Sequence, residues 1–521
     1  MEKRKVSSGI AALLAVLIAV QIWVIAGFGA RKDGFDIDEL FTYGLANSYG
    51  EPFISPREGE WTSGERFMAY LTVDGHAHEY LNVYDNQIAD VHPPLYYLFI
   101  HAVCSVFRAA GLSKWTSIGV NLICFAVTQI ALFFLACRVL TGSWRPAFIA
   151  LLPVAVYGFG AGAITGAVFI RMYAMMTMWA VLLSLSLVWL WQEGLTPARL
   201  LALKAALIGG FLTQYYFTML AGLLCGALFF ALLASRRAKE AGRLVAHCFL
   251  ALALGIAMFP WCMAHIFGGY RGLGAFEQAS SLSFDDLRRW CGILFDVINR
   301  QQFAGFLPWL AAAALALTAI ALPLRRARAP QMRGAGLALV GLFAAMTYIA
   351  LVAAVSPYKV DRYILCVYPL AVLGVFALLA RALGALGPRR GGALLSAALL
   401  LALGALSVKD GQVHYLFEGR DECVRVCEAH ADLPCVLLGS NDMTENLLEL
   451  AAFEHVLVLS KDDGGQVAQK LDELDAYDPE RGFVLLQRYE DEEALARIVE
   501  AAGASGALPL YTHQLTAYLV R

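Results

Sequence analysis

Long apolar runs recur through most of this 521-residue chain, from Ile10 to about Leu406. A helix needs about 20 apolar residues to cross the hydrocarbon core of a bilayer, and runs of this length return between short polar gaps. Hydrophobic residues make up 59% of the chain and charged residues 16%, which excludes an ordinary soluble domain. The sequence therefore predicts a polytopic α-helical protein of the cell membrane.

The basic residues between the apolar runs predict how the chain is threaded. The first run follows Lys3-Arg4-Lys5 and is too long for a typical signal peptide, so we expect a retained span with a cytoplasmic amino terminus. Basic residues then cluster in alternate gaps, which we assign to the cytoplasm. This alternation requires the helix predicted over 93–107 to lie along the outer surface. The basic gaps are 138–145, 199–204, 236–243, 325–333 and 381–390.

About eleven spans result, and the carboxyl-terminal tail lies outside. We expect a membrane domain over 1–407, with an outer loop at 31–116 that includes the interfacial helix. The tail at 408–521 alternates helical and strand patterns, which predicts a small extracytoplasmic α/β domain. Its acid-rich helices argue against nucleic-acid binding. The predicted spans are 10–28, 117–137, 147–164, 172–191, 200–213, 217–234, 244–262, 305–323, 335–355, 362–380 and 391–406.

Acidic residues gather in the outer loop. Asp36, Asp38 and Glu39 come just where the chain leaves the first span, and Asp90 precedes His92-Pro93-Pro94. A solvated loop can carry this charge without any function. Carboxylates against a membrane surface are, however, partly desolvated, which raises their basicity. The pattern therefore indicates candidate general bases.

Further polar residues stand at the predicted outer ends of the spans. Arg, Lys and Tyr at such positions commonly anchor helices at the headgroup layer, and that interpretation stays open for each of them. Their concentration on one side nevertheless predicts an extracytoplasmic active face. These residues are Arg171, Tyr173, Tyr216, Lys359, Arg362 and Tyr363.

Four motifs resemble those of membrane glycosyltransferases with the C-type fold (GT-C), which use polyprenyl-phosphate sugars. The most similar branch is the protein O-mannosyltransferase and aminoarabinose transferase group, often called glycosyltransferase family 39-like. The resemblance covers roughly 8–380. It rests on the Asp-Glu pair after the first span, the His-Pro-Pro-Leu motif, an Arg-Met-Tyr segment and a late Arg-Tyr…Tyr-Pro segment.

The resemblance implies roles for single residues. The catalytic acid pair of the family falls on Asp38 and Glu39, and its second loop acid falls on Asp90. Arg171 and Tyr173 match the external Arg-x-Tyr segment. Two departures concern the donor contacts: several relatives have an Asp shortly after that segment, and many have an Arg opening the second span. The late motif matches Arg362, Tyr363, Tyr368 and Pro369; the departures stand at Met176-Thr177 and Lys114 to Ser117.

Transfer of a sugar from a lipid phosphate to a hydroxyl needs a carboxylate to take the proton and cations to stabilise the departing phosphate. We predict that Asp38 is the base and that Glu39 orients the acceptor or binds a cation, with Asp90 as a third catalytic acid. The resemblance implies a hexosyl- or pentosyltransferase that inverts the anomeric carbon. The predicted phosphate clamp is His92, Arg171, Lys359 and Arg362, and the predicted substrate-lining residues are Asp36, Tyr96, Tyr173, Tyr216 and Tyr363.

A divalent cation is a possible cofactor. His76, His78 and Glu79, with Asp74, form a small set of metal-ligand types, but the spacing matches no specific zinc pattern. Exposed loop residues are the preferred interpretation. The expected partners are a polyprenyl-phosphate sugar donor, membrane lipids, and an acceptor that is a protein, a lipid or a cell-wall glycan of the cell envelope; nucleic acid is not expected.

Two other classes stay open. A polyprenyl-linked sugar flippase or transporter would also be polytopic, but it would place ionisable residues near the bilayer midplane or show paired repeats. Here the polar groups concentrate at the predicted outer boundary. A non-catalytic lipid-sugar binding protein would use the same residues without turnover.

Overall fold

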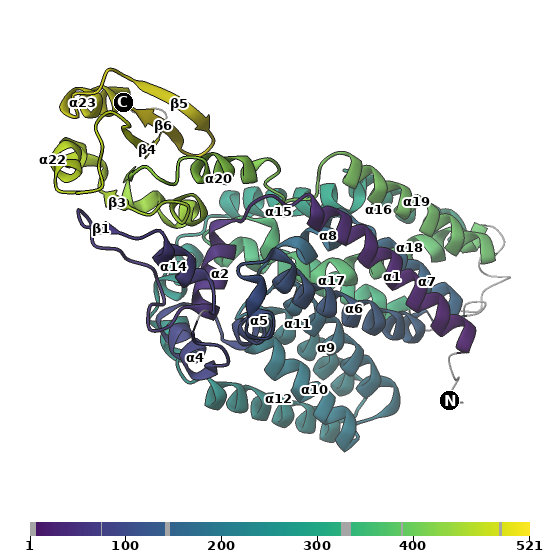
Figure 1. The fold of residues 1–521 in the computed structure, drawn as a ribbon. Helices are drawn as coiled ribbons and strands as arrows, with labels where there is room; N and C mark the ends of the chain where they lie inside the picture. The colour runs from purple at the N-terminus through teal and green to yellow at the C-terminus, as the bar shows by residue number, and fades with distance from the viewer. Residues whose placement is uncertain (1–6, 74, 141–145, 325–334, 387–388, 489–491) are drawn as a thin grey trace. The chain divides into compact units, whose positions relative to one another are not determined.

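The computed structural model describes residues 7–73, 75–140, 146–324, 335–386, 389–488 and 492–521. The chain divides into two compact units. Figure 1 draws its helices and strands. Unit 1 consists of 1–29, 90–96 and 118–414, and unit 2 consists of 30–89, 97–117 and 415–521. This division differs from the predicted boundary at 407/408, because the outer loop is grouped with the tail. The basic gap at 325–333 and parts of two others, 141–145 and 387–388, lie outside the described residues.

Long apolar helices make up unit 1. Each of the eleven predicted spans coincides with one helix or one bent helix pair, which confirms a multi-pass α-helical membrane protein. α10 (Pro197–Phe211) has only 15 residues. Two pairs are bent, α7 (Pro146–Gly158) with α8 (Ala161–Val168) by 63°, and α15 (Phe284–Phe303) with α16 (Leu307–Leu324) by 80°. The eight long helices in the described part are α1 (Ser8–Ala30), α6 (Lys114–Val139), α9 (Tyr173–Glu193), α11 (Phe217–Ala234), α12 (Ala238–Met258), α17 (Ala335–Val355), α18 (Tyr368–Leu386) and α19 (Arg389–Lys409).

Three buried glutamines accompany the break between α7 and α8. The last carbonyl groups of a helix have no hydrogen-bond donor within the helix. In the hydrocarbon region no water is present to donate to them instead. Gln21 Nε2 donates to the carbonyl of Val154 at 3.1 Å, and Gln302 Nε2 donates to that of Val156 at 3.2 Å. Gln129 Nε2 in turn donates to Gln21 Oε1 at 2.9 Å. These amides stabilise the end of α7, and the chain restarts as α8 just before Arg171.

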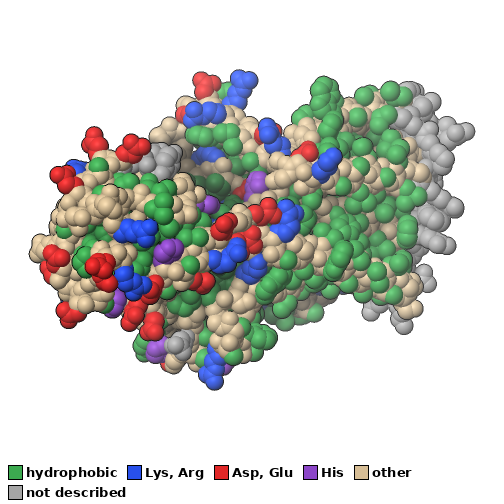
Figure 2. Space-filling model, turned by 45° about the horizontal axis from the view of Figure 1, so that its top comes forward, with side chains coloured by type: hydrophobic (Ala, Val, Ile, Leu, Met, Phe, Trp, Pro, Cys, Tyr) green, Lys and Arg blue, Asp and Glu red, His purple; other side chains and the backbone are tan. Residues whose placement is uncertain are grey.

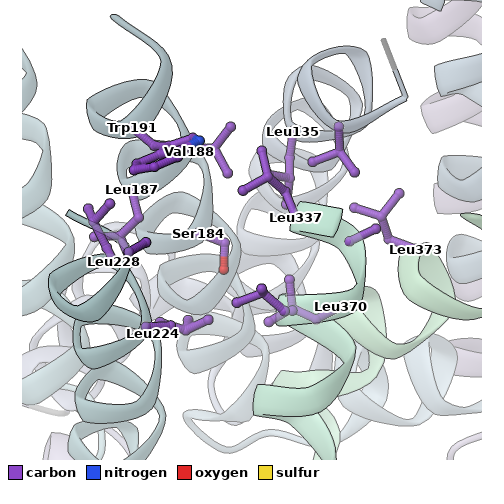
Figure 3. A pocket seen from close by; sticks show the side chains of 16 residues that line it. Leu135, Ser184, Leu187, Val188, Trp191, Leu224, Leu228, Leu337, Leu370 and Leu373 are labelled. Atoms are coloured by element: carbon purple, nitrogen blue, oxygen red, sulfur yellow. The ribbon is translucent and has the colours of Figure 1, made fainter. Parts of the chain in front are cut away.

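The helices of unit 1 present apolar surfaces outside and inside. Hydrophobic side chains cover the region of α16, α18 and α19 with few charges among them (Figure 2). An apolar cavity lies among α6, α9, α11, α17 and α18 (Figure 3). All its lining residues are uncharged, and the hydroxyl of Ser184 donates to the carbonyl of Ala180 in its own helix at 2.8 Å. Such a lining offers no charged groups that could bind an ion along the cavity.

Unit 2 contains the predicted small α/β domain. Its six-stranded sheet has the order β1-β3-β2-β4-β6-β5, with β2 parallel to β3 and β4 and the other pairs antiparallel. Apolar residues from β2, β3, β4 and α23 form its core, among them Val436, Leu457, Leu485 and Ile498. The elements are β1 (Trp61–Thr62), β2 (Cys435–Leu438), β3 (Val456–Leu459), β4 (Phe483–Gln487), β5 (Ala507–Thr512), β6 (Thr516–Val520), α20 (Arg420–Glu428), α22 (Val467–Asp472) and α23 (Glu492–Ala501).

The outer loop contributes the edge strand β1, which sequence reasoning missed. Trp61 pairs with Leu457 of β3, and its indole Nε1 donates to the Lys470 carbonyl at 2.9 Å. The rest of the loop forms α2 (Ile37–Asn47), α3 (Glu65–Leu71), α4 (Tyr80–Ala89) and α5 (Leu95–Val106). α5 has 12 residues and so extends about 18 Å, which is short of the hydrocarbon core of about 30 Å. This length favours the predicted interfacial position.

Gly64 lets the loop approach the sheet. Its amide donates to the Phe453 carbonyl at 3.0 Å, and a β-carbon at Gly64 would lie 2.1 Å from that oxygen. We expect Gly64→Ala to displace β1 and to lower the free energy of unfolding of unit 2 by about 1–3 kcal/mol. Hydrogen–deuterium exchange of peptides covering 57–62 should increase. Gly465→Ala, where a β-carbon meets nothing within 4 Å, is the matched control, and equal exchange in both variants would contradict this view of β1.

Candidate functional site

Asp90 and His92 form a hydrogen-bonded pair in unit 1. His92 Nδ1 donates to Asp90 Oδ2 at 2.8 Å, and Asp90 is only 9% exposed. Burial alone would raise the pKa of the Asp90 carboxyl, but the charge and hydrogen bond of His92 and the charge of Arg171 outweigh it. The pKa of Asp90 therefore lies below its ordinary value. A carboxylate held as an anion in this way is better suited to orienting His92 than to accepting a proton.

Arg171 stands at the corner between α8 and α9, and neighbouring polar groups fix that corner. Asn121 Nδ2 donates to the carbonyls of Phe169 at 2.7 Å and Ala167 at 3.2 Å. The hydroxyl of Tyr96 donates to Asn121 Oδ1 at 3.0 Å. Tyr96 is fully buried and its hydroxyl supports the corner, while its substrate-lining role stays a prediction. Arg171, which is only 3% exposed, thus stands on a turn that these hydrogen bonds hold in place.

The structure brings Arg362 together with three predicted tyrosines. The Arg362 guanidinium lies 5.8 Å from the ring centroid of Tyr363 and 5.9 Å from that of Phe169. The Tyr363 ring meets Tyr216 edge-on at 5.3 Å and Tyr173 at 6.0 Å. Aromatic faces hold a guanidinium in place without neutralising it. Three separate stretches of unit 1, at 169–173, 216 and 362–363, therefore build one cationic and aromatic cluster.

Two further cations of unit 1 lie over aromatic rings. Lys359 Nζ is 5.1 Å from the Trp290 ring centroid and donates to the Ser356 carbonyl. Burial lowers the pKa of Lys359 from its ordinary value. Arg271, which sequence reasoning did not single out, lies 4.8 Å from the ring of Tyr358. Its position between the predicted spans 244–262 and 305–323 was the only sequence signal for it.

A buried network around Asp361 was also missed. Asp361 Oδ1 accepts from the Arg362 amide at 2.7 Å, and Oδ2 accepts from Gln301 Nε2 at 2.9 Å and from His414 Nδ1 at 2.7 Å. Tyr368, a residue of the late motif, donates to Gln301 Oε1 at 2.7 Å. The network joins α15, α18 and the segment after α19 to the backbone of Arg362. It therefore holds the late motif in one conformation.

In unit 2, the acidic residues after α1 form a helix cap. Asp36 is the N-cap of α2: its Oδ1 accepts from the Asp38 amide at 2.9 Å, while Glu39 Oε2 accepts from the Asp36 amide at 2.7 Å. Glu39 is fully buried and pairs with Lys32 Nζ at 2.8 Å. Asp38 lies half-buried on the first turn. Asp36 and Glu39 thus have a structural task that the sequence interpretation did not assign.

The residues proposed as a weak metal set form other contacts. His76 stacks on Tyr49 with ring centroids 4.0 Å apart, and its Nδ1 is 3.4 Å from Glu79 Oε1. His78 Nδ1 is 3.5 Å from the Tyr80 hydroxyl. Asp74 lies outside the described residues. Among those that are described, no group of three or more His, Cys, Asp or Glu is arranged to hold a metal ion.

No protein-family model and no curated protein sequence matches the chain. The chain is, however, similar to several solved structures. ArnT from Cupriavidus metallidurans bound to undecaprenyl phosphate is 12% identical, with a TM-score of 0.57 and 98% of each chain covered. The chain has the GT-C fold. The archaeal oligosaccharyltransferase AglB from Archaeoglobus fulgidus, in complex with an inhibitory peptide and a dolichol-phosphate, is 10% identical with a TM-score of 0.50, covering 98% of this chain and 74% of AglB. These likenesses confirm the GT-C fold expected from the motifs.

The contacts of Asp90 predict how the stability of the protein depends on pH. Because the folded-state pKa of Asp90 is depressed, its contribution to stability is full above the unfolded Asp value of about 3.9 and is lost as pH falls through the folded value. Asp90→Asn should lower the free energy of unfolding at pH 6 by about 1.5–3 kcal/mol. Thermal unfolding in detergent from pH 6 to pH 3 should show this difference shrinking. Asp296→Asn, in the exposed Asp296–Arg300 pair, should change little, and a difference that grows on acidification would refute the assignment.

Proposed function

We propose that this GT-C protein is an integral membrane glycosyltransferase that takes a sugar from a polyprenyl-phosphate donor on the extracytoplasmic side. The observation that carries the proposal is the cationic and aromatic cluster around Arg362 in unit 1, two of whose aromatic residues, Phe169 and Tyr173, flank Arg171 in the chain. Guanidinium groups bind phosphate oxygens in a bidentate manner, and the surrounding spans provide an apolar environment for a polyprenyl tail. The likeness to ArnT bound to undecaprenyl phosphate and to AglB with a dolichol-phosphate supports this choice of donor.

In the proposed reaction the acceptor hydroxyl attacks the anomeric carbon of the donor sugar. The new bond from the acceptor oxygen forms as the bond from carbon to phosphate oxygen breaks, so the anomeric carbon is inverted. A carboxylate takes the hydroxyl proton, and the motif resemblance assigns this role to Asp38. Arg171, Arg362 and His92 stabilise the charge that returns to the lipid phosphate. General base catalysis of this kind contributes about 10²–10⁴-fold.

The flippase and binding-protein alternatives make different demands. A flippase has to carry a charged sugar phosphate across the bilayer, for which the uncharged lining of the cavity in Figure 3 is poorly suited. A binding protein would use the same cationic cluster without turnover. A transfer assay therefore separates the proposal from both.

The first test is transfer by the purified protein in detergent, with a panel of polyprenyl-phosphate monosaccharides. We expect turnover of one donor, and a kcat about 100-fold or more lower for Asp38→Asn with donor binding retained. Asp85→Asn removes an exposed carboxylate of the same loop and should leave kcat unchanged. Donor binding without turnover in the wild type would overturn the proposal, and an active Asp38→Asn variant would remove Asp38 from it.

Arg362 provides a second test. Lysine keeps the positive charge but loses the planar fork that binds two phosphate oxygens. Arg362→Lys should therefore raise the donor KM about tenfold, corresponding to about 1.4 kcal/mol, and Arg362→Gln should raise it further. Arg300→Lys is the control, because that arginine is exposed in a surface pair. An unchanged donor KM in Arg362→Gln would exclude this cluster from phosphate binding.

A further inference from the structure

An ion pair and hydrogen bonds join two segments of unit 2. One segment follows the first span of the chain, and the other follows the last span. Arg31 Nε pairs with Glu418 Oε1 at 2.7 Å, and the Asp33 amide donates to the Leu416 carbonyl at 2.9 Å. Asp33 Oδ2 also accepts from the Gly419 amide at 2.9 Å. We call residues 31–33 and 415–419 the exit clamp. Its contacts tie the start of the outer loop to the start of the tail over nearly 400 positions of sequence.

Backbone strain marks the tail side of the exit clamp. Tyr415 and Phe417 have φ values of 65° and 50°, in the left-handed region that bulky residues rarely adopt. Such conformations persist only where surrounding contacts enforce them, and they tend to occur at functional sites. One enforcing contact is close packing at Gly34, where a β-carbon would lie 2.8 Å from Arg420 Cδ and 3.0 Å from Phe417 Cβ.

Lys32 lies at the centre of the exit clamp. Its side chain is fully buried, and its ammonium group donates to Glu39 Oε2 at 2.8 Å and to the Tyr415 carbonyl at 2.6 Å. The rings of Phe417 and Phe35 lie 5.3 and 5.7 Å from the same nitrogen. An ammonium without partners at such a position would cost several kcal/mol. The arrangement therefore ties the position of Lys32 to both Glu39 and the tail.

We propose that Lys32 is a positioning residue that fixes the first turn of α2 through Glu39 and couples that turn to the tail through Tyr415. The first turn carries Asp38, so the proposal rests on the proposed function for the chemical role of that carboxylate. Glu39 then holds the first turn of α2 through its contacts with Lys32 and the Asp36 amide. The tail affects catalysis because its contact with Lys32 helps to hold α2. Neither role was expected from the sequence, which assigned Glu39 to the acceptor or a cation.

The Lys32–Glu39 ion pair can be tested by removing one charge or both charges. Removing one partner of a buried ion pair leaves an uncompensated charge, whereas replacing both by neutral groups of similar shape is often close to neutral. Met at position 32 keeps an apolar stem against the aromatic rings, and Gln at position 39 still accepts from the Asp36 amide. Lys32→Met should thus be harmful alone and be rescued by Glu39→Gln.

The experiment compares Lys32→Met, Glu39→Gln and the double variant as full-length proteins in detergent. Lys32→Met should increase hydrogen–deuterium exchange over 37–43 and lower kcat about 100-fold with donor KM unchanged, because misplacement by about 1 Å has that effect. The double variant should regain slow exchange and most of kcat. Arg57→Gln, at an exposed cation of the same loop, is the matched control.

Each outcome bears on the proposal. Wild-type exchange in Lys32→Met would overturn it, as would a double variant that exchanges slowly yet has no turnover, because Glu39 would then act on substrate. If Lys32→Met does not accumulate, a folded and active double variant supports the proposal, and a double variant that also fails to accumulate overturns it. If the wild type transfers no sugar, the proposed function fails, and the exchange data alone decide on the exit clamp.

Discussion

Charged and polar groups that enter or border the hydrocarbon region have to find partners within the protein, because water is not there to solvate them. The rest of the structure follows from how this requirement is met. In unit 1 the carboxylate of Asp361 is surrounded by Gln301, His414 and the Arg362 amide. In unit 2 Lys32 and Glu39 neutralise each other where the chain leaves its first span. The first cluster fixes the backbone at Arg362, and the second fixes the first turn of α2.

The helical spans could be predicted because their signal is local. An apolar run of about 20 residues is visible without knowing its neighbours, and all eleven predicted spans coincide with helices or bent pairs. The break between α7 and α8 carries no comparable signal. It depends on Gln21, Gln129 and Gln302, which lie far apart in sequence and meet only in the folded bundle. The same reason explains why β1 was missed, since a two-residue strand has no pattern of its own.

The candidate site was predictable to a similar extent. Residues in recognisable motifs at span ends, such as Arg362 and Tyr363, do meet in one cluster. Their supports were not predictable, because Gln301 and His414 are separated by 113 positions and neither belongs to a motif. Tyr96 shows the converse case. It stands next to the His-Pro-Pro-Leu motif, and its hydroxyl donates to Asn121 inside the bundle, a structural contact that its position in the sequence does not indicate.

The environments of the three predicted catalytic acids separate their roles. A general base has to accept a proton during the reaction, so a carboxylate stabilised as an anion by close cations is a poor choice. Asp90 is held in this way by His92 and Arg171, and Glu39 has Lys32 Nζ at 2.8 Å. Asp38 shares the first turn of α2 with Glu39 and lies half-buried, and its amide donates to Asp36 Oδ1 in the helix cap. The cap and the Lys32–Glu39 ion pair therefore hold the first turn of α2 in place, and that turn carries Asp38, the residue that we propose as the base.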